Sequence, residues 1–212
     1  MAVKLQHVAP TDIETESFKI IANEFGPHEM DLPTFKVVQR VIHATGDFSF
    51  KDNMRFSAGA IEKGIQNLRD GRDVLTDVSM VASGISKKLL SRWGGRVLCR
   101  IGDKDVAEKA KELHQTRSEA AIEAALQDNV GIIAIGNAPT ALIKTVALVK
   151  TMPPAQRPLV IGVPVGFVNA AESKQLLFEE NNCCITSLGR KGGSPVAAAI
   201  VNALLHLAAQ DV

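Results

Sequence analysis

Aromatic residues are scarce in this chain of 212 residues. They make up 4% of the sequence, with one tryptophan and no tyrosine. Proteins that bind RNA or single-stranded nucleic acid stack bases on aromatic side chains, so nucleic acid is not an expected partner. The 24 lysines and arginines nearly cancel the 23 aspartates and glutamates, which leaves a net charge of +1. General attraction to a phosphate backbone is therefore not expected either, although net charge does not tell where the charges lie.

Long apolar runs and paired cysteines are also lacking. The most apolar stretch, residues 195–209, is interrupted by polar residues and is shorter than the run of about 20 apolar residues that spans a membrane. Cys99, Cys183 and Cys184 have no metal-ligand spacing, and an odd number of cysteines suits a reducing compartment. The first ten residues lack the pattern of an export signal. We therefore expect a cytoplasmic protein with no membrane anchor and no metal site.

Helical and extended segments alternate along the whole chain, which is typical of a parallel sheet with helices on both faces. The expected strands are short apolar runs at residues 74–78, 96–101, 131–135, 159–163 and 184–188. An alternating pair, Phe48 and Phe50, indicates a further short extended segment. Length and pattern together predict a single α/β domain over residues 1–212, with a mostly parallel five-stranded sheet.

Glycine and proline mark three of the turns that would connect a strand to the next helix. These turns are residues 136–140, 162–166 and 192–195. Glycine allows the backbone to approach a ligand, and proline at a helix start leaves the other N–H groups free to face an anion. Each turn alone is explained as a tight connection, but three at one edge of a sheet favour a ligand crevice. None of them fits the P-loop or the dinucleotide fingerprint.

Basic residues lie beside the same turns, namely Arg117, Lys174, Arg190 and Lys191. Arginine binds a carboxylate through two parallel hydrogen bonds and lysine acts as a point charge, so this pattern suits a ligand with several negative charges. Ordinary solvated surface charges remain the alternative for each residue taken singly.

Five histidines are candidates for proton transfer, and His43 has the most suggestive surroundings. It is expected in the last turn of a helix, one turn after Arg40 and just before Asp47. A helix C-terminus and a nearby carboxylate both favour imidazolium, the form that a general acid needs. His206, in the apolar last helix, is interpreted as a core histidine. From the residues alone, a purely structural role for His43 stays open.

Several strings in this sequence together resemble one family. They are RVIHATGD at 40–47, RFSAGA at 55–60, IGNAPTAL at 135–142, PVGFVNAAESK at 164–174 and GRKGGSPVAAAIVNA at 189–203. In this order they are similar to precorrin-8X methylmutase, also called precorrin isomerase, of corrin biosynthesis. The resemblance runs from about residue 12 to about residue 206 and is far more specific than a lone glycine motif.

The resemblance implies a three-layer flavodoxin-like fold, a homodimer and a tetrapyrrole substrate. The family moves a methyl group from C-11 to C-12 of ring C, which gives hydrogenobyrinate or, with cobalt in the substrate, cobyrinate. Because the methyl group migrates within one molecule, no S-adenosylmethionine or other cofactor is implied. The resemblance assigns acid/base catalysis to His43, which would protonate the ring C nitrogen and so lower the barrier to a 1,5-sigmatropic shift. Neighbouring enzymes of the pathway form a further class of expected partners.

Family precedent places Ser17 and Arg40 beside the substrate, whose acetate and propionate groups need basic partners. The full expected substrate-binding set is Ser17, Arg40, Thr45, Arg117, Asn137, Lys174, Arg190, Lys191 and Ser194, together with the backbone N–H groups of the turns at Asn137 and Ser194. Two alternative functions stay open. One is a tetrapyrrole carrier without chemistry, and the other is a flavodoxin-like enzyme that binds a phosphate ester or a nucleotide.

Overall fold

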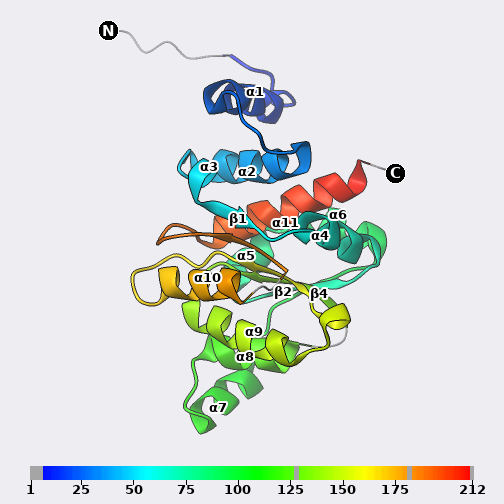
Figure 1. Ribbon diagram of the computed structural model, residues 1–212. Coiled ribbons are helices and arrows are strands. Elements are labelled where there is room, and N and C mark those ends of the chain that lie inside the picture. Colours follow the sequence, from blue (N-terminus) through cyan, green and yellow to red (C-terminus); the bar gives the residue numbers. More distant parts are fainter. Residues whose placement is uncertain (1–6, 127–128, 181–182, 211–212) are drawn as a thin grey trace.

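The computed structural model describes residues 7–126, 129–180 and 183–210. These residues form one six-stranded sheet in the order β1-β6-β5-β4-β2-β3 (Figure 1). The neighbouring strands from β2 to β6 pair in parallel, and β1 pairs antiparallel with β6. The strands are β1 (Met54–Phe56), β2 (Asp73–Thr76), β3 (Val97–Leu98), β4 (Val130–Ile135), β5 (Leu159–Gly162) and β6 (Cys184–Ser187).

The predicted α/β class and mostly parallel sheet are confirmed, and the number of strands is corrected from five to six. The five predicted strands are all present, and the additional strand, β1, forms an edge of the sheet. The expected extended segment at Phe48 and Phe50 is wrong, because Phe50 begins the short helix α3 (Phe50–Asn53). β1 follows that helix and has three residues, of which Met54 is buried. So short a strand has no alternating pattern that the sequence could reveal.

The order of the parallel strands identifies where this kind of sheet normally binds a ligand. Read as β3-β2-β4-β5-β6, the order is the second-first-third-fourth-fifth arrangement of doubly wound sheets. The winding reverses between β2 and β4, and ligands of such sheets usually bind outside the carboxyl ends of the strands at that point.

One face of the sheet is covered by α11 (Ser194–Ala209), which packs against both the sheet and α2 (Leu32–Thr45). Because α11 is enclosed on both sides, apolar residues occur all round it. Outside α2 lies α1 (Ile13–Phe25), so two helical layers are added to the expected three (Figure 1). The shorter elements on this side are α4 (Ala60–Arg69), α5 (Ser79–Gly84), α6 (Lys87–Leu90) and the 3₁₀ turn η1 (Ser91–Trp93).

The opposite face is covered by α8, α9 and α10, and α7 packs outside α8. These elements are α7 (Lys104–Glu112), α8 (Arg117–Ala125), α9 (Pro139–Thr151), η2 (Pro154–Gln156) and α10 (Ala170–Glu179). A second apolar core, separate from that of the α11 side, lies between them and the sheet. Across the three described ranges, we find no helix that is long and apolar enough to cross a membrane.

Candidate functional site

The C-terminal turn of α2 presents His43 to solvent. The helix is capped at its start by Asp31, whose carboxylate accepts a hydrogen bond from the N–H of Thr34 at 2.7 Å. It ends at Gly46, whose φ of 65° is left-handed and whose N–H donates to the carbonyl oxygen of Ile42 at 2.7 Å. Glycine adopts this conformation without strain, so the helix stops directly after the turn that contains His43. The predicted place of His43 at a helix C-terminus is confirmed.

The phenyl ring of Phe18 lies next to His43, and the guanidinium group of Arg40 lies next to that ring. The centroids of the Phe18 ring and the His43 ring are 5.1 Å apart, and the guanidinium carbon of Arg40 lies 5.0 Å from the centroid of Phe18. Nη1 of Arg40 donates to Oε1 of Glu14 at 3.0 Å. Sequence reasoning missed Phe18 and Glu14, because nothing in the pattern of α1 shows which of its residues face α2.

Two pockets open along α2 and α11, and Arg40 lines both of them. The pocket beside His43 has a volume of about 220 Å³, and its walls are formed by Arg40, His43, Ala44, Gly84, Pro195, Ala198, Ala199 and Asn202. The other has a volume of about 260 Å³ and is lined by residues of α1, α2 and α11, including Glu14, Phe18 and His206. The interpretation of His206 as a core histidine is wrong, because it is exposed at this pocket. Partial burial lowers the pKa of His206, and the positive charge of Arg40 lowers it further.

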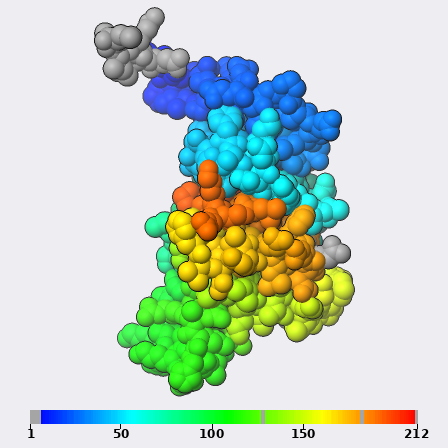
Figure 2. All heavy atoms as spheres, turned by 60° about the vertical axis from the view of Figure 1, so that its left-hand side comes forward, coloured from blue at the N-terminus to red at the C-terminus, as the bar shows by residue number. Residues whose placement is uncertain are grey.

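Lys191 connects the loop between β6 and α11 to the end of α2. Its ammonium group donates to Oδ2 of Asp47 at 2.6 Å and to Oγ of Ser49 at 3.0 Å. The hydrogen bond from Lys191 and those from Ser49, whose backbone N–H donates to Oδ1 of Asp47 at 2.9 Å, hold the pKa of Asp47 at about 2. Figure 2 shows the cyan segment after α2 directly above this orange loop. Thr45 and Lys191, two of the expected substrate-binding residues, thus lie at the same end of α2 as His43.

Lys174 lies beneath the same loop and is fully buried. Its ammonium group donates to the carbonyl oxygen of Lys191 at 2.7 Å, and the hydroxyl of Ser187 donates to the same oxygen at 3.1 Å. Burial lowers the pKa of Lys174 to about 8. The expected contact between Lys174 and a substrate carboxylate is not supported here, because the ammonium group holds the backbone of the loop and does not reach the surface.

The turn after β4 already holds a carboxylate. Fully buried Asp77, which follows β2, accepts hydrogen bonds from the N–H groups of Gly136 at 3.1 Å, Asn137 at 2.8 Å and Ala138 at 2.8 Å. Burial raises the pKa of Asp77, and the three N–H donors oppose that effect. The expectation that the backbone of the Asn137 turn binds a substrate carboxylate is not supported here, because Asp77 occupies these donors. The side chain of Asn137 remains exposed at the edge of the sheet.

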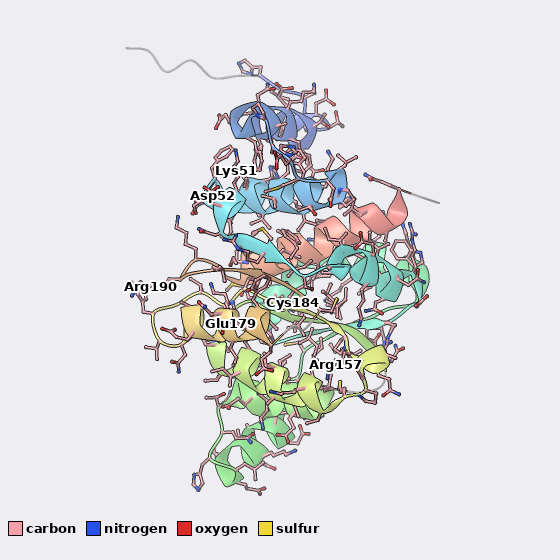
Figure 3. The ribbon with its side chains drawn as sticks, in the orientation of Figure 1. Lys51, Asp52, Arg157, Glu179, Cys184 and Arg190 are labelled. Carbon is pink, nitrogen blue, oxygen red and sulfur yellow. The ribbon has the colours of Figure 1, made fainter. Side chains whose placement is uncertain are left out.

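The other expected site residues are spread around the molecule. Ser194 is buried at the start of α11, close to the turn after β4. Arg190 lies at the outer surface, with its guanidinium carbon 5.4 Å from the ring centroid of Phe167 (Figure 3). Ser17 lines a separate pocket on α1, and Arg117 begins α8 on the opposite face of the sheet. The structure thus groups His43, Arg40, Thr45 and Lys191, and it does not bring Ser17 or Arg117 to that group.

No cluster of histidine, cysteine, aspartate or glutamate suited to a metal ion occurs in the part of the chain that the structure describes. What the grouped residues offer is an exposed imidazole beside cationic groups. This arrangement can exchange a proton with a bound molecule and hold its carboxylates.

This chain is similar to known proteins over nearly its whole length. The family described as precorrin-8X methylmutase matches residues 12–207. A cobalt-precorrin-8 methylmutase of Priestia megaterium is 44% identical, over 97% of this chain and 91% of that protein. A precorrin-8X methylmutase of Pseudomonas aeruginosa is 39% identical, over 91% of this chain and 93% of that protein.

A solved structure gives the same result. The crystal structure of precorrin-8X methylmutase from Thermus thermophilus superposes with a TM-score of 0.86 at 40% identity, and the match covers 95% of this chain and 97% of that one. The chain therefore belongs to the precorrin-8X methylmutase family of cobalamin biosynthesis and is a methylmutase, an isomerase.

Proposed function

We propose that this methylmutase uses His43 as its proton donor and acceptor. It moves the methyl group from C-11 to C-12 of ring C in precorrin-8X or its cobalt form, and so produces hydrogenobyrinate or cobyrinate. The observation that carries the proposal is the exposed His43 imidazole in the wall of a pocket that also contains Arg40.

The proposed reaction requires few functional groups from the protein. A 1,5-sigmatropic shift needs no nucleophile and no redox step, but it needs a macrocycle held in place and a proton on one nitrogen. In the proposed cycle the His43 imidazolium donates its proton to the ring C nitrogen, and the methyl group migrates. The neutral imidazole then takes the proton back from that nitrogen, so no proton is consumed. A histidine suits both steps because its side chain changes protonation near neutral pH.

The carboxylates of the substrate need cationic and hydrogen-bonding partners. The proposed cationic partners at this end of α2 are Arg40, which lies over the Phe18 ring beside His43, and Lys191, which donates to Asp47 just after the helix. A further contact at this end of α2 is proposed for Thr45, and more distant contacts are proposed for Ser17, Arg117, Asn137, Arg190 and Ser194. Lys174 has a supporting role in this proposal, since it binds the backbone of the loop that carries Lys191.

The size of the pocket supports a homodimer. At about 220 Å³, the pocket beside His43 is smaller than the about 300–1,000 Å³ of typical ligand sites, whereas a tetrapyrrole is a large ligand. We propose that a second copy completes the enclosure. Phe167 and Val168, which are 82% and 78% exposed, supply apolar surface for such contacts. Sedimentation velocity would test this, and a monomer at working enzyme concentrations would contradict it.

Asp77 weighs against the nucleotide-binding alternative. It follows β2 and binds the N–H groups after β4, at the point where the winding of the sheet reverses. A phosphate group would require these same donors. The carrier alternative differs from the enzyme in turnover alone, so it is addressed by the experiment that follows.

The proposed role of His43 is tested by comparing His43→Ala with the wild type. Both metal-free and cobalt-bearing substrates would be incubated without added cofactor, and the change in absorption as product forms would be followed. We expect the variant to bind substrate and to lose about 10²–10⁴-fold in kcat, the contribution typical of general acid–base catalysis. His7→Ala, in the exposed N-terminal segment, is the matched control.

Two results would contradict the proposal. Full turnover by His43→Ala would remove the imidazole from the mechanism. Stoichiometric binding to the wild type without any change of either substrate would instead identify a carrier.

A further inference from the structure

Arg40, a proposed carboxylate-binding group, already holds a carboxylate of this chain. Its Nη1 donates to Oε1 of Glu14 at 3.0 Å, and both residues line the pocket of about 260 Å³. The Arg40 side chain is 17% exposed, whereas that of Glu14 is 55% exposed. Glu14 thus occupies, from the solvent side, the position at Arg40 that a substrate carboxylate needs.

We propose that Glu14 is an internal substitute for a substrate carboxylate, and that substrate binding exchanges one carboxylate for the other at Arg40. This inference rests on the proposed function, because it requires a ligand with carboxylate groups at this site. An arginine fork binds either carboxylate through the same donors, so the exchange keeps the guanidinium paired throughout.

The exposure of Glu14 makes this exchange feasible. An ion pair with one partner mostly in solvent contributes little to stability, so a ligand carboxylate can displace it. The neighbouring pair of Lys191 and Asp47 is different. Asp47 is 31% exposed, and its carboxylate also accepts the backbone N–H of Ser49 at 2.9 Å. Of the two ion pairs next to His43, the one with Glu14 is therefore the one suited to exchange.

Phe18 keeps Arg40 in place during the exchange. The Arg40 guanidinium carbon lies 5.0 Å from the centroid of the Phe18 ring, within the range of a cation–π contact. The same ring contacts His43, with 5.1 Å between centroids. When Glu14 leaves, this contact remains, so Arg40 can receive the new carboxylate without moving relative to His43.

The test compares Glu14→Gln with Glu16→Gln. Both variants remove one negative charge from α1, but Glu16 pairs with Lys19 at 3.3 Å and not with Arg40. We expect Glu14→Gln to lower the KM for substrate by about fivefold and to leave kcat unchanged, because the competing carboxylate is gone. The dissociation constant of hydrogenobyrinate, measured by absorbance titration, should fall equally. Both changes should vanish when Arg40→Ala is added to either protein.

Each other outcome has a definite meaning. A rise in KM for Glu14→Gln would show that Glu14 orients Arg40, and an equal fall for Glu16→Gln would show a general charge effect; either result overturns the inference. Unchanged KM values in an active wild type would overturn the inference and leave the proposed function standing. Failure of the wild type to convert either substrate would instead overturn the proposed function itself.

Discussion

The turn after β4 and the pocket lined by α1, α2 and α11 balance positive charge in two different ways. In each, a carboxylate of the chain satisfies positively polarised donors. Asp77 is fully buried and accepts three backbone N–H groups, whereas Glu14 is 55% exposed and pairs with one guanidinium. Burial excludes water and competing anions, so the first contact is a fixed part of the fold. Exposure leaves the second open to replacement by a ligand.

The difference also agrees with the proposed place of the reaction. The reversal point of the sheet is the usual ligand position in this architecture, but Asp77 fills it. The open, cationic surface lies instead around the end of α2, which belongs to neither layer that directly covers the sheet. The helices added outside the α/β core therefore supply the candidate catalytic groups.

Asp77→Ala tests whether the buried carboxylate is a fixed part of the fold. The substitution leaves three buried N–H groups without their acceptor, so we expect the free energy of unfolding to fall by about 3–5 kcal/mol. Urea denaturation would measure it. Asp70→Ala, at the exposed end of α4, should cost less than about 0.5 kcal/mol. Equal effects of the two substitutions would show that Asp77 is no more fixed than a surface carboxylate.

Lys174 extends the comparison to a buried cation. Its pKa is about 8 in the folded protein and 10.5 when unperturbed, so between these values the unfolded chain binds a proton that the folded chain does not. Stability should therefore rise as the pH increases from about 8 to 10.5, by at most about 3 kcal/mol from this group. In Lys174→Met this part of the rise should be absent. Lys19→Met, an exposed lysine, should retain it.

Added salt should weaken the effect of the exposed carboxylate, Glu14, more than that of the buried carboxylate, Asp77. This difference is smaller than the two effects above. Raising sodium chloride to about 0.5 M screens exposed ion pairs much more than buried contacts. The fivefold advantage in KM expected for Glu14→Gln should then shrink to about twofold. The difference in unfolding free energy between the wild type and Asp77→Ala should stay the same. A parallel loss of both effects would show that burial does not distinguish the two sites.

Much of the fold was predictable because its strands are continuous apolar runs. Strand β1 was not, since its register depends on pairing Met54 with Ser187, far along the chain. The place of His43 was predictable from the helix stop at Gly46, which is a local signal.

The partners in the site were not predictable, because they are set by tertiary contacts. Glu14 and Arg40 are 26 residues apart, and Asp77 lies 59 residues from Gly136. Lys174 was expected to bind a substrate carboxylate because it lies beside a glycine turn, but its ammonium group donates to a backbone oxygen that no motif reveals.

The outermost position of α1 has a consequence for how this enzyme can change. This helix packs mainly on α2 and lies far from the sheet (Figure 1), yet it carries both Glu14 and Phe18. If Glu14 exchanges with a substrate carboxylate as proposed, we expect substitutions at Glu14 to alter the affinity for acidic macrocycles while the sheet stays as it is. Engineering of substrate range is best begun on this one helix.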